Sequence, residues 1–153
     1  MPEAGVDLHR LIWSPDDLDG DTLTTSAFPR DDLKGGERYL SVSRTDILDA
    51  EVERQRANRQ AAAASDNPKL VRDDAMSVVL NCGEVCRVED TNGVRPFTVT
   101  SEPIPNDNEA HCGIHNSTGQ AGKGYVNQLR ALLVRLASPP QKLDDFLSSI
   151  RDS

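Results

Sequence analysis

Hydrophobic and polar positions alternate along residues 38–44 ("RYLSVSR"), with the period of two that is typical of a half-buried strand. Residues 9–14 ("HRLIWS") are a short apolar run that also predicts a strand. Residues 22–28 are also rich in β-forming side chains, and the turn-forming pair Asp19-Gly20 precedes them. The pattern therefore predicts three strands, and it predicts that residues 9–14 and 22–28 are joined as a hairpin.

Two amphipathic helices are predicted at the C-terminal end of the chain. Residues 124–137 place apolar side chains at helical spacing, at Val126, Leu129, Leu132, Leu133 and Leu136. Pro139 and Pro140 end this helix and begin another one in the appended segment 138–153. The apolar face of this last helix consists of Leu143, Phe146, Leu147 and Ile150.

The central part of the chain predicts a helix of a different kind. Residues 45–64 are good helix formers, but after Val52 the only apolar side chains are alanines. A helix this polar docks weakly on a core, so we expect its distal half and the following residues 65–70 to project or fray. The segment 51–74 is then a polar insertion, or an arm that binds a partner.

The remaining pattern predicts strands and turns. Residues 75–80 and 110–115 are predicted strands, and Asn81 and Glu84 have the spacing of a capping box that starts a short helical turn. Asn92-Gly93 predicts a second hairpin, and Pro96 places its outgoing arm at a sheet edge. We expect a single α+β domain over residues 1–153, with a mixed, mainly antiparallel sheet and the C-terminal helices on one face.

The charge of the chain restricts the classes of partner that it can bind. The formal net charge is −8 and the pI is about 4.8, which disfavours nucleic acid and anionic membranes and favours protein partners. No apolar run is long enough to span a bilayer, and the start of the chain has no export signal. Together with an odd number of cysteines, this predicts free thiols and a cytoplasmic protein. The oligomeric state is left open.

The segment "NEAHCGIHNSTGQAGKGY" invites a metal hypothesis, since His111 and His115 are four residues apart. On a strand four residues span roughly 13 Å, whereas zinc binds nitrogen at about 2 Å. If the segment is a strand, the two histidines therefore cannot bind the same ion. A set of Cys82, Cys86, His111 and Cys112 is a weak alternative. Adjacent residues of a strand face opposite sides. His111 and Cys112 are therefore not expected to bind one metal ion together, and His111 is not expected to activate the thiol of Cys112. We therefore expect no metal and no cofactor.

The glycine-rich loop Gly119–Gly124 could bind an anion at the start of the following helix. It does not match a P-loop, because Ser117 and Gly124 occupy positions where that motif needs a glycine and a Ser or Thr. Main-chain N–H groups at a helix start and the charge of Lys123 still favour weak anion binding by Gly122, Lys123 and Gly124. The alternative is that the glycines only let the chain turn.

Two short patches, "HRL" (9–11) and "TTSAF" (24–28), resemble ADP-ribosyltransferases. Those enzymes hold a nicotinamide dinucleotide with a His or Arg on the first strand and an S/T-x-S run on a later one. The resemblance implies that His9, Arg10, Thr25 and Ser26 bind a dinucleotide. The catalytic Glu or Gln of those enzymes has no clear counterpart in this chain.

A second resemblance covers most of the chain. The runs "DGDTLTTSAF", "RYLSVSR", "VVLNCGEVCRV" and "EPIPNDNEAHCGIH" resemble a family of small uncharacterised bacterial proteins with SxAF, S-V-x-R and N-x-A-H motifs. The family has no assigned activity, and its motifs single out Ser26, Phe28, Arg44 and His111 without roles. The insertion and the helix after Pro139 depart from its pattern.

These observations favour a small non-enzymatic module that binds a protein partner through the apolar face of the last helix. The alternative use of that face is the protein's own core. The competing hypothesis is an ADP-ribosyltransferase-like or nucleotide-binding enzyme that uses His111, the glycine loop and Arg10. The two hypotheses differ in whether His111 lies in a polar cleft beside Arg10 or Arg44, or in the sheet core.

Overall fold

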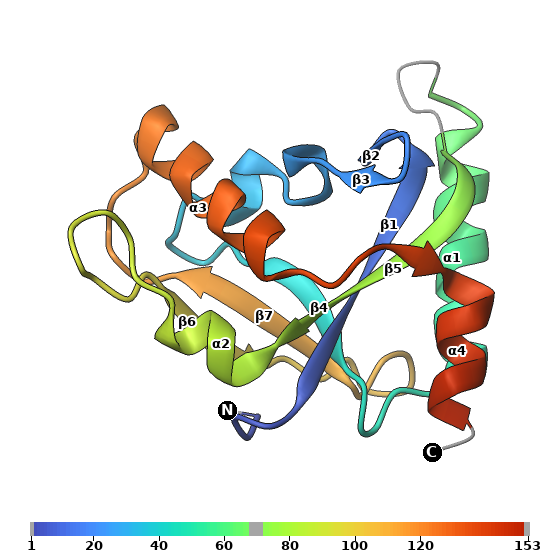
Figure 1. Cartoon of the computed structure of the whole chain (residues 1–153). Helices are drawn as coiled ribbons and strands as arrows, with labels where there is room; N and C mark the ends of the chain where they lie inside the picture. Colours follow the sequence, from blue (N-terminus) through green and yellow to red (C-terminus); the bar gives the residue numbers. More distant parts are fainter. Residues whose placement is uncertain (1, 68–71, 152–153) are drawn as a thin grey trace.

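The computed structural model describes residues 2–67 and 72–151, which form an α+β fold around a six-stranded sheet (Figure 1). The sheet strands are β1 (Asp7–Pro15), β4 (Leu40–Arg44), β5 (Arg72–Asn81), β6 (Phe97–Ser101), β7 (His111–Asn116) and β8 (Gln141–Lys142). A small hairpin comprises β2 (Leu18–Asp19) and β3 (Thr22–Leu23). The helices are α1 (Ala50–Ala64), α2 (Cys82–Arg87), α3 (Lys123–Leu136) and α4 (Leu143–Arg151), with 3-10 turns at Thr25–Ala27 and Arg30–Leu33.

The sheet has the order β6-β7-β4-β1-β5-β8, and all of its neighbouring strands are antiparallel. β1 pairs with β5 along its whole length. Its pairing with β4 is confined to the start of the strand, where Leu8 lies opposite Arg44 and His9 opposite Ser43. Beyond His9 the two strands separate, and a polar cavity lies at this split.

The two faces of the sheet follow from the alternation of side chains along β1. Leu8 and Ile12 point to one face, where α3, α2 and the 3-10 turns cover a large apolar cluster. Leu11 and Trp13 point to the other face, where they pack with α1 and α4 in a smaller cluster. Figure 1 shows α1 and α4 side by side at one end of the sheet, and the two helices are in contact.

The predicted α+β class is confirmed, whereas the placement of the C-terminal helices needs correction. We expected α3 and α4 on one face, but they lie on opposite faces. The reason is the linker after Pro139, which forms β8 at the edge of the sheet before α4 begins. The chain therefore passes around the edge of the sheet between the two helices.

The central helix also differs from the prediction. α1 begins at Ala50, with Asp49 as its cap, rather than at residue 45. It does not project, because Glu53, Ala57 and Ala64 are buried against the sheet and α4. Small alanines let a helix approach a sheet closely, so α1 packs against the sheet without large apolar side chains. Residues 68–71 of the predicted insertion lie outside the described residues.

Local capping and turn predictions had mixed outcomes. Asn81 caps α2 by accepting from the N–H of Glu84, as predicted. Asn92-Gly93 does form a turn, organised by the carboxylate of Asp90, but only its outgoing arm, β6, is a strand, so the predicted hairpin is wrong. Asp19-Gly20 does form a hairpin turn, but it joins β2 and β3, which have two residues each. The predicted pairing of residues 9–14 with 22–28 is wrong, because β1 belongs to the six-stranded sheet and Thr25–Ala27 form a 3-10 turn.

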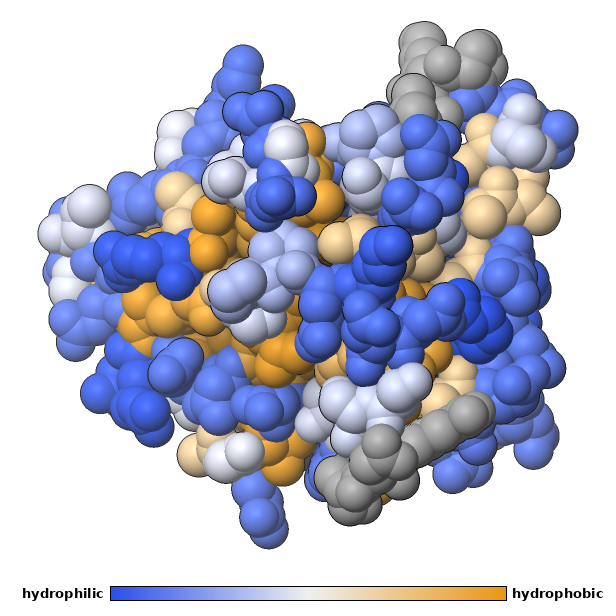
Figure 2. All heavy atoms as spheres, turned by 45° about the vertical axis from the view of Figure 1, so that its right-hand side comes forward, coloured by the Kyte–Doolittle hydropathy of each residue, from blue (hydrophilic) through white to orange (hydrophobic). Residues whose placement is uncertain are grey.

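The surface is mixed in character. On the face shown in Figure 2, hydrophilic residues cover much of the molecule, and hydrophobic residues are visible between them. Within the described part of the chain, no helix has the length and apolar character needed to cross a membrane.

Candidate functional site

The two histidines of β7 lie on extended backbone, as predicted. His111 and His115 share one face of the strand, and the ring of Tyr39 packs between them, with centroids 5.7 Å and 5.2 Å away. Gly113 makes this possible, since a Cβ at that position would lie 2.6 Å from the Tyr39 ring. His111 also bonds through Nδ1 to the carbonyl of Glu102 at 2.7 Å. These contacts give both rings a packing role.

The weak metal alternative is not assembled. Cys112 points into the apolar cluster together with Cys82, on the opposite face of β7 from His111. Burial and the neighbouring Cys86 raise the pKa of Cys82 to about 11, and burial raises the pKa of Cys112, so both thiols are protonated at neutral pH. Over residues 2–67 and 72–151, no group of three or more His, Cys, Asp or Glu side chains is arranged to hold a metal ion.

The glycine loop before α3 is open to solvent. Gly122 is the N-cap residue of α3, and Gly122, Lys123 and Gly124 are all exposed. Asn116 organises the loop by donating to the carbonyl of Gln120 at 2.7 Å. The loop therefore has a clear structural role in turning the chain from β7 into α3.

The apolar face of α4 packs inside the protein. Leu143, Phe146 and Leu147 are 1%, 3% and 6% exposed, and Ile150 packs against the same cluster. This corrects the expectation that these four side chains form a partner-binding surface, because the sheet and α1 already cover them.

A chain of polar side chains is buried beneath α1 and α4. His9 bonds through Nδ1 to the hydroxyl of Ser77 at 2.7 Å and through Nε2 to the carboxylate of Glu53. Arg56 holds the same carboxylate with two bonds, from Nε at 2.5 Å and Nη2 at 2.8 Å. The ring of Phe146 stacks on His9 with centroids 4.6 Å apart. The network therefore ties α1 and α4 to the centre of the sheet.

The protonation states of this network follow from burial and charge. Burial by itself raises the pKa of Glu53, but the bonds from Arg56 and His9 outweigh it and lower the pKa to about 2. Burial lowers the pKa of His9 despite the neighbouring carboxylate. At neutral pH a neutral His9 therefore donates from Nε2 to an ionised Glu53 and accepts from the hydroxyl of Ser77.

A serine, a histidine and a glutamate in series are also the elements of a nucleophilic relay. Here Ser77, His9 and Glu53 are all fully buried, and none of them lines the cavities beside α1. The arrangement is therefore structural. Sequence reasoning missed Glu53, although a signal was present: Glu53, Ala57, Ala61 and Ala64 follow helical spacing and form one face of α1.

A polar cavity of about 320 Å³ lies where β1 and β4 separate. α1 borders it on one side of the sheet and the 3-10 turns on the other. Arg10 spans the split, donating from Nε to the carbonyl of Ala27 at 2.7 Å and from Nη1 to the carbonyl of Ser41 at 2.8 Å. The polar groups around the cavity are Arg10, Asp17, Ser26, Asp32, Ser41, Arg56, Gln60 and Arg72.

The main chain of β1 adds a donor to this cavity. The N–H and C=O of Trp13 bond to Asp17, on the side of β1 that faces away from β5. Because main-chain groups alternate sides along a strand, those of Leu11 face the same side. This alternation directs the N–H of Leu11, a lining residue of the cavity, toward the split.

The charges around the cavity are unevenly compensated. Burial lowers the pKa of Arg10 to about 10, so its guanidinium stays charged at neutral pH. Asp17 and Asp32 act on it only at longer range, and burial raises the pKa of both carboxyls. Among the described residues, no carboxylate comes within ion-pair distance of Arg10. A largely desolvated cation without an ion-pair partner is costly, and a bound anion would relieve that cost.

Two further arginines border the same space. Arg56 is held in place by Glu53, and Arg72 lies over the ring of Trp13, 5.6 Å from its centroid. A planar guanidinium that is held rigidly is suited to bidentate recognition of an oxyanion.

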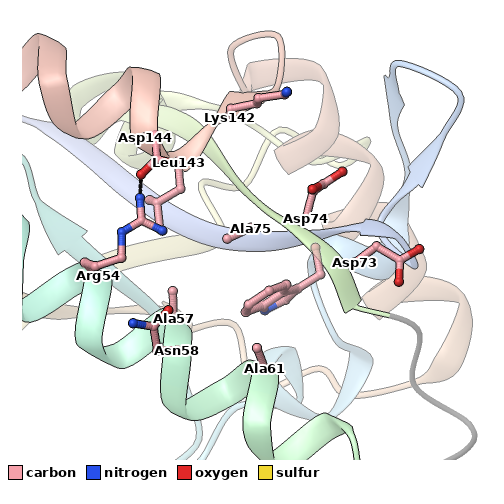
Figure 3. Close-up of a pocket in the computed structure, with 11 residues that line it drawn as sticks. Arg54, Ala57, Asn58, Ala61, Asp73, Asp74, Ala75, Lys142, Leu143 and Asp144 are labelled. Atoms are coloured by element: carbon pink, nitrogen blue, oxygen red, sulfur yellow. Dashed lines mark ion pairs between the residues drawn. The ribbon is translucent and has the colours of Figure 1, made fainter.

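A second cavity provides a contrast. It measures about 330 Å³ and lies between α1, the start of β5 and the start of α4 (Figure 3). Ala57, Ala61 and the ring of Trp13 form part of its lining. Arg54 reaches over it from α1 and forms an ion pair with Asp144. This cation is neutralised within the protein, in contrast to Arg10.

The cavity at the split brings together only some of the residues singled out from the sequence. Arg10 and Ser26 line it, whereas Arg44 pairs with Asp46 at the surface and His111 packs on Tyr39. Phe28 belongs to the apolar core. Arg56, Arg72 and Gln60 were not anticipated, because their meeting with Arg10 depends on the packing of α1 and β5.

No family model, curated protein or solved structure matches the chain. The two resemblances therefore remain sequence-based expectations.

Proposed function

We propose that the protein binds a small molecule through an anionic head group in the cavity between β1 and β4. The observation that carries this proposal is Arg10, a charged side chain in the split of the sheet that has carbonyl partners but no ion pair with any described residue. An anion in the cavity supplies the missing countercharge.

The lining of the cavity favours a singly charged head group. Arg56 is already paired with Glu53, so Arg10 and Arg72 are left opposite Asp17 and Asp32. A lining this close to neutral accommodates one negative charge at lower cost than two. The main-chain N–H of Leu11 and the hydroxyl of Ser26 add neutral donors. A carboxylate therefore fits this lining better than a doubly charged phosphate.

This proposal retains part of an earlier hypothesis. Arg10 and Ser26 were expected to bind a dinucleotide together with His9 and Thr25. His9 is fully buried and engaged by Glu53, so it is not available to a ligand. Thr25 is exposed and does not line the cavity. The proposal keeps anion binding by Arg10 and Ser26 and assigns no reaction to the site.

Titration of the protein with small anions tests the proposal, and the fluorescence of Trp13, the single tryptophan, reports binding because this residue lines the cavity. Acetate, glutamate and inorganic phosphate are added at constant ionic strength while the fluorescence is recorded. We expect the carboxylates to bind more tightly than phosphate. The substitution Arg72→Gln should weaken binding by about tenfold, as expected for one charge-assisted contact.

Arg59→Gln is the matched control, since Arg59 is an exposed arginine of α1 outside the cavity. Carboxylate affinity should also rise as the pH is lowered, because burial raises the pKa of Asp17 and Asp32 and their protonation removes repulsion. Equal effects of Arg72→Gln and Arg59→Gln, or no response to any of the three anions, would refute the proposal.

A further inference from the structure

A groove on another part of the surface combines an apolar centre with an acidic rim. It measures about 320 Å³ and lies between the segment that leads into α1 and the loop that precedes β7. Ile47, Val52 and Ala110 provide apolar surface, and Asp49, Asp107 and Glu109 provide carboxylates. It shares no lining residue with the cavity at the split of the sheet.

Ile47 is the most exposed large hydrophobic side chain of the described residues, at 52% of its surface. Single exposed hydrophobic residues are common, and Val94 is another example at 47%. Ile47 differs from Val94 because it forms a wall of a groove instead of standing alone on a turn. A side chain in that position can be buried by a partner without rearrangement of the protein.

The opposite wall of the groove is held in one conformation. Ile104 and Asn108 exchange two main-chain hydrogen bonds of 2.9 Å and 3.0 Å. The side chain of Asn108 is buried and donates to Ser43 at 3.1 Å. Asn106 completes the turn in the left-handed region, with φ of 61°. A wall that is ordered before binding lowers the entropic cost of association.

The charges define the chemistry of the occupant. No cation belongs to the lining of the groove. Arg59 of α1 makes an exposed contact of 3.3 Å with Asp107 at the rim, and the carboxylate of Asp49 accepts two main-chain N–H bonds as the cap of α1, so the acidic rim keeps a net negative charge. The chain as a whole carries a net charge of −8. A second copy of this chain would bring like charges together, and nucleic acid would be repelled.

We propose that the groove binds a segment of a partner protein in which an apolar side chain is flanked by lysine or arginine residues. The apolar side chain contacts Ile47 and Val52, and its cationic neighbours face Asp49, Asp107 and Glu109. The groove shares no lining residue with the anion cavity, and none of its lining residues belongs to α4.

Fluorescence anisotropy of the full chain with two labelled peptides tests the proposal. One probe has a central leucine flanked by two lysines on each side, and the other has glutamates in place of the lysines. We expect only the lysine peptide to bind. Ile47→Ser should weaken this binding about tenfold through the loss of buried apolar surface. Glu109→Gln should weaken it about threefold and reduce its salt dependence.

Val94→Ser is the matched control, because it removes a similarly exposed side chain elsewhere and should leave the affinity unchanged. Arg72→Gln should also leave it unchanged, which separates this proposal from the one for the cavity. Three outcomes overturn the inference: equal affinities of Ile47→Ser and Val94→Ser, equal binding of both peptides, or no anisotropy change up to about 1 mM peptide. A dimer that Ile47→Ser dissociates would also overturn it, by assigning the groove to a second copy.

Discussion

The face of the sheet under α3 and the face under α1 and α4 bury different kinds of residue. Under α3, twenty buried residues of the described chain form one apolar cluster, in which Phe28 and Leu133 are fully buried. Under α1 and α4 the corresponding cluster has six residues, and the buried polar chain of His9, Glu53 and Ser77 lies beside it.

The difference shows two ways to attach a helix to a sheet. α3 presents large aliphatic side chains to the core, and its hydrogen bonds, such as those from Arg130 to the carbonyls of Phe28 and Thr25, lie at the margin of this apolar contact. α1 has mainly alanines to offer, so hydrogen bonds and charge pairing at Glu53 supply part of its attachment. When an apolar side chain is shortened, the loss of protein stability grows with the volume removed. The stabilisation from a buried polar network, in contrast, depends on every hydrogen-bonding partner being present.

The largest effect should come from the apolar face. Phe28→Ala removes a fully buried ring and should lower the free energy of unfolding by about 4 kcal/mol. Urea denaturation followed by Trp13 fluorescence measures this loss. Val94→Ala, at an exposed position, should change stability by less than about 0.5 kcal/mol. A similar loss for both variants would contradict the assignment of the main core to this face.

A somewhat smaller effect is expected on the polar face. Glu53→Gln keeps the shape of the side chain but removes the charge that His9 and Arg56 share, and should cost about 3 kcal/mol. Glu51→Gln, an exposed change two residues earlier on α1, serves as the control. If both variants had wild-type stability in urea, the buried network would not be what attaches α1.

The smallest expected effect is a difference between the two faces in how the free energy of unfolding depends on pH. The pKa of His9 is lowered from its ordinary value of 6.5, so the unfolded chain takes up a proton that the folded protein does not, and stability falls as the pH drops through 6.5. Glu53 has a folded pKa of about 2 against an ordinary 4.5, so its contribution is lost between pH 4.5 and 2.

The wild type and Glu53→Gln should therefore converge in stability as the pH falls from 4.5 toward 2, whereas the deficit of Phe28→Ala should stay constant. Chemical denaturation at a series of pH values provides the comparison. A Glu53→Gln deficit that did not vary with pH would show that this carboxylate is not the ionised partner of the network.

Much of the fold could be predicted from local patterns. The apolar run in residues 9–14, the period of two in residues 38–44, the helical spacing of the leucines in α3 and the cap at Asn81 all correspond to observed elements. These features depend on neighbours close in sequence, where dihedral preferences and hydrophobic periodicity act directly. The extended backbone at His111 and His115 was predictable for the same reason.

The candidate sites were only partly predictable. Arg10 and Ser26 could be singled out, but their partners Arg56 and Arg72 come from α1 and β5, which meet β1 only after folding. The importance of Glu53 was concealed because a charged residue on a polar helix ordinarily faces solvent. The apolar face of α4 was visible in the sequence, but its coverage by the sheet was not.

The sequence by itself determined the α+β class, the principal helices and strands and the acidic character of the chain, since these depend on short-range periodicity and summed charge. Only the tertiary structure decided which face each helix covers, where β1 and β4 separate and which charges remain without a partner. Burial and charge compensation depend on residues distant in sequence, such as Arg10 and Arg56, and those contacts exist only once the sheet has formed.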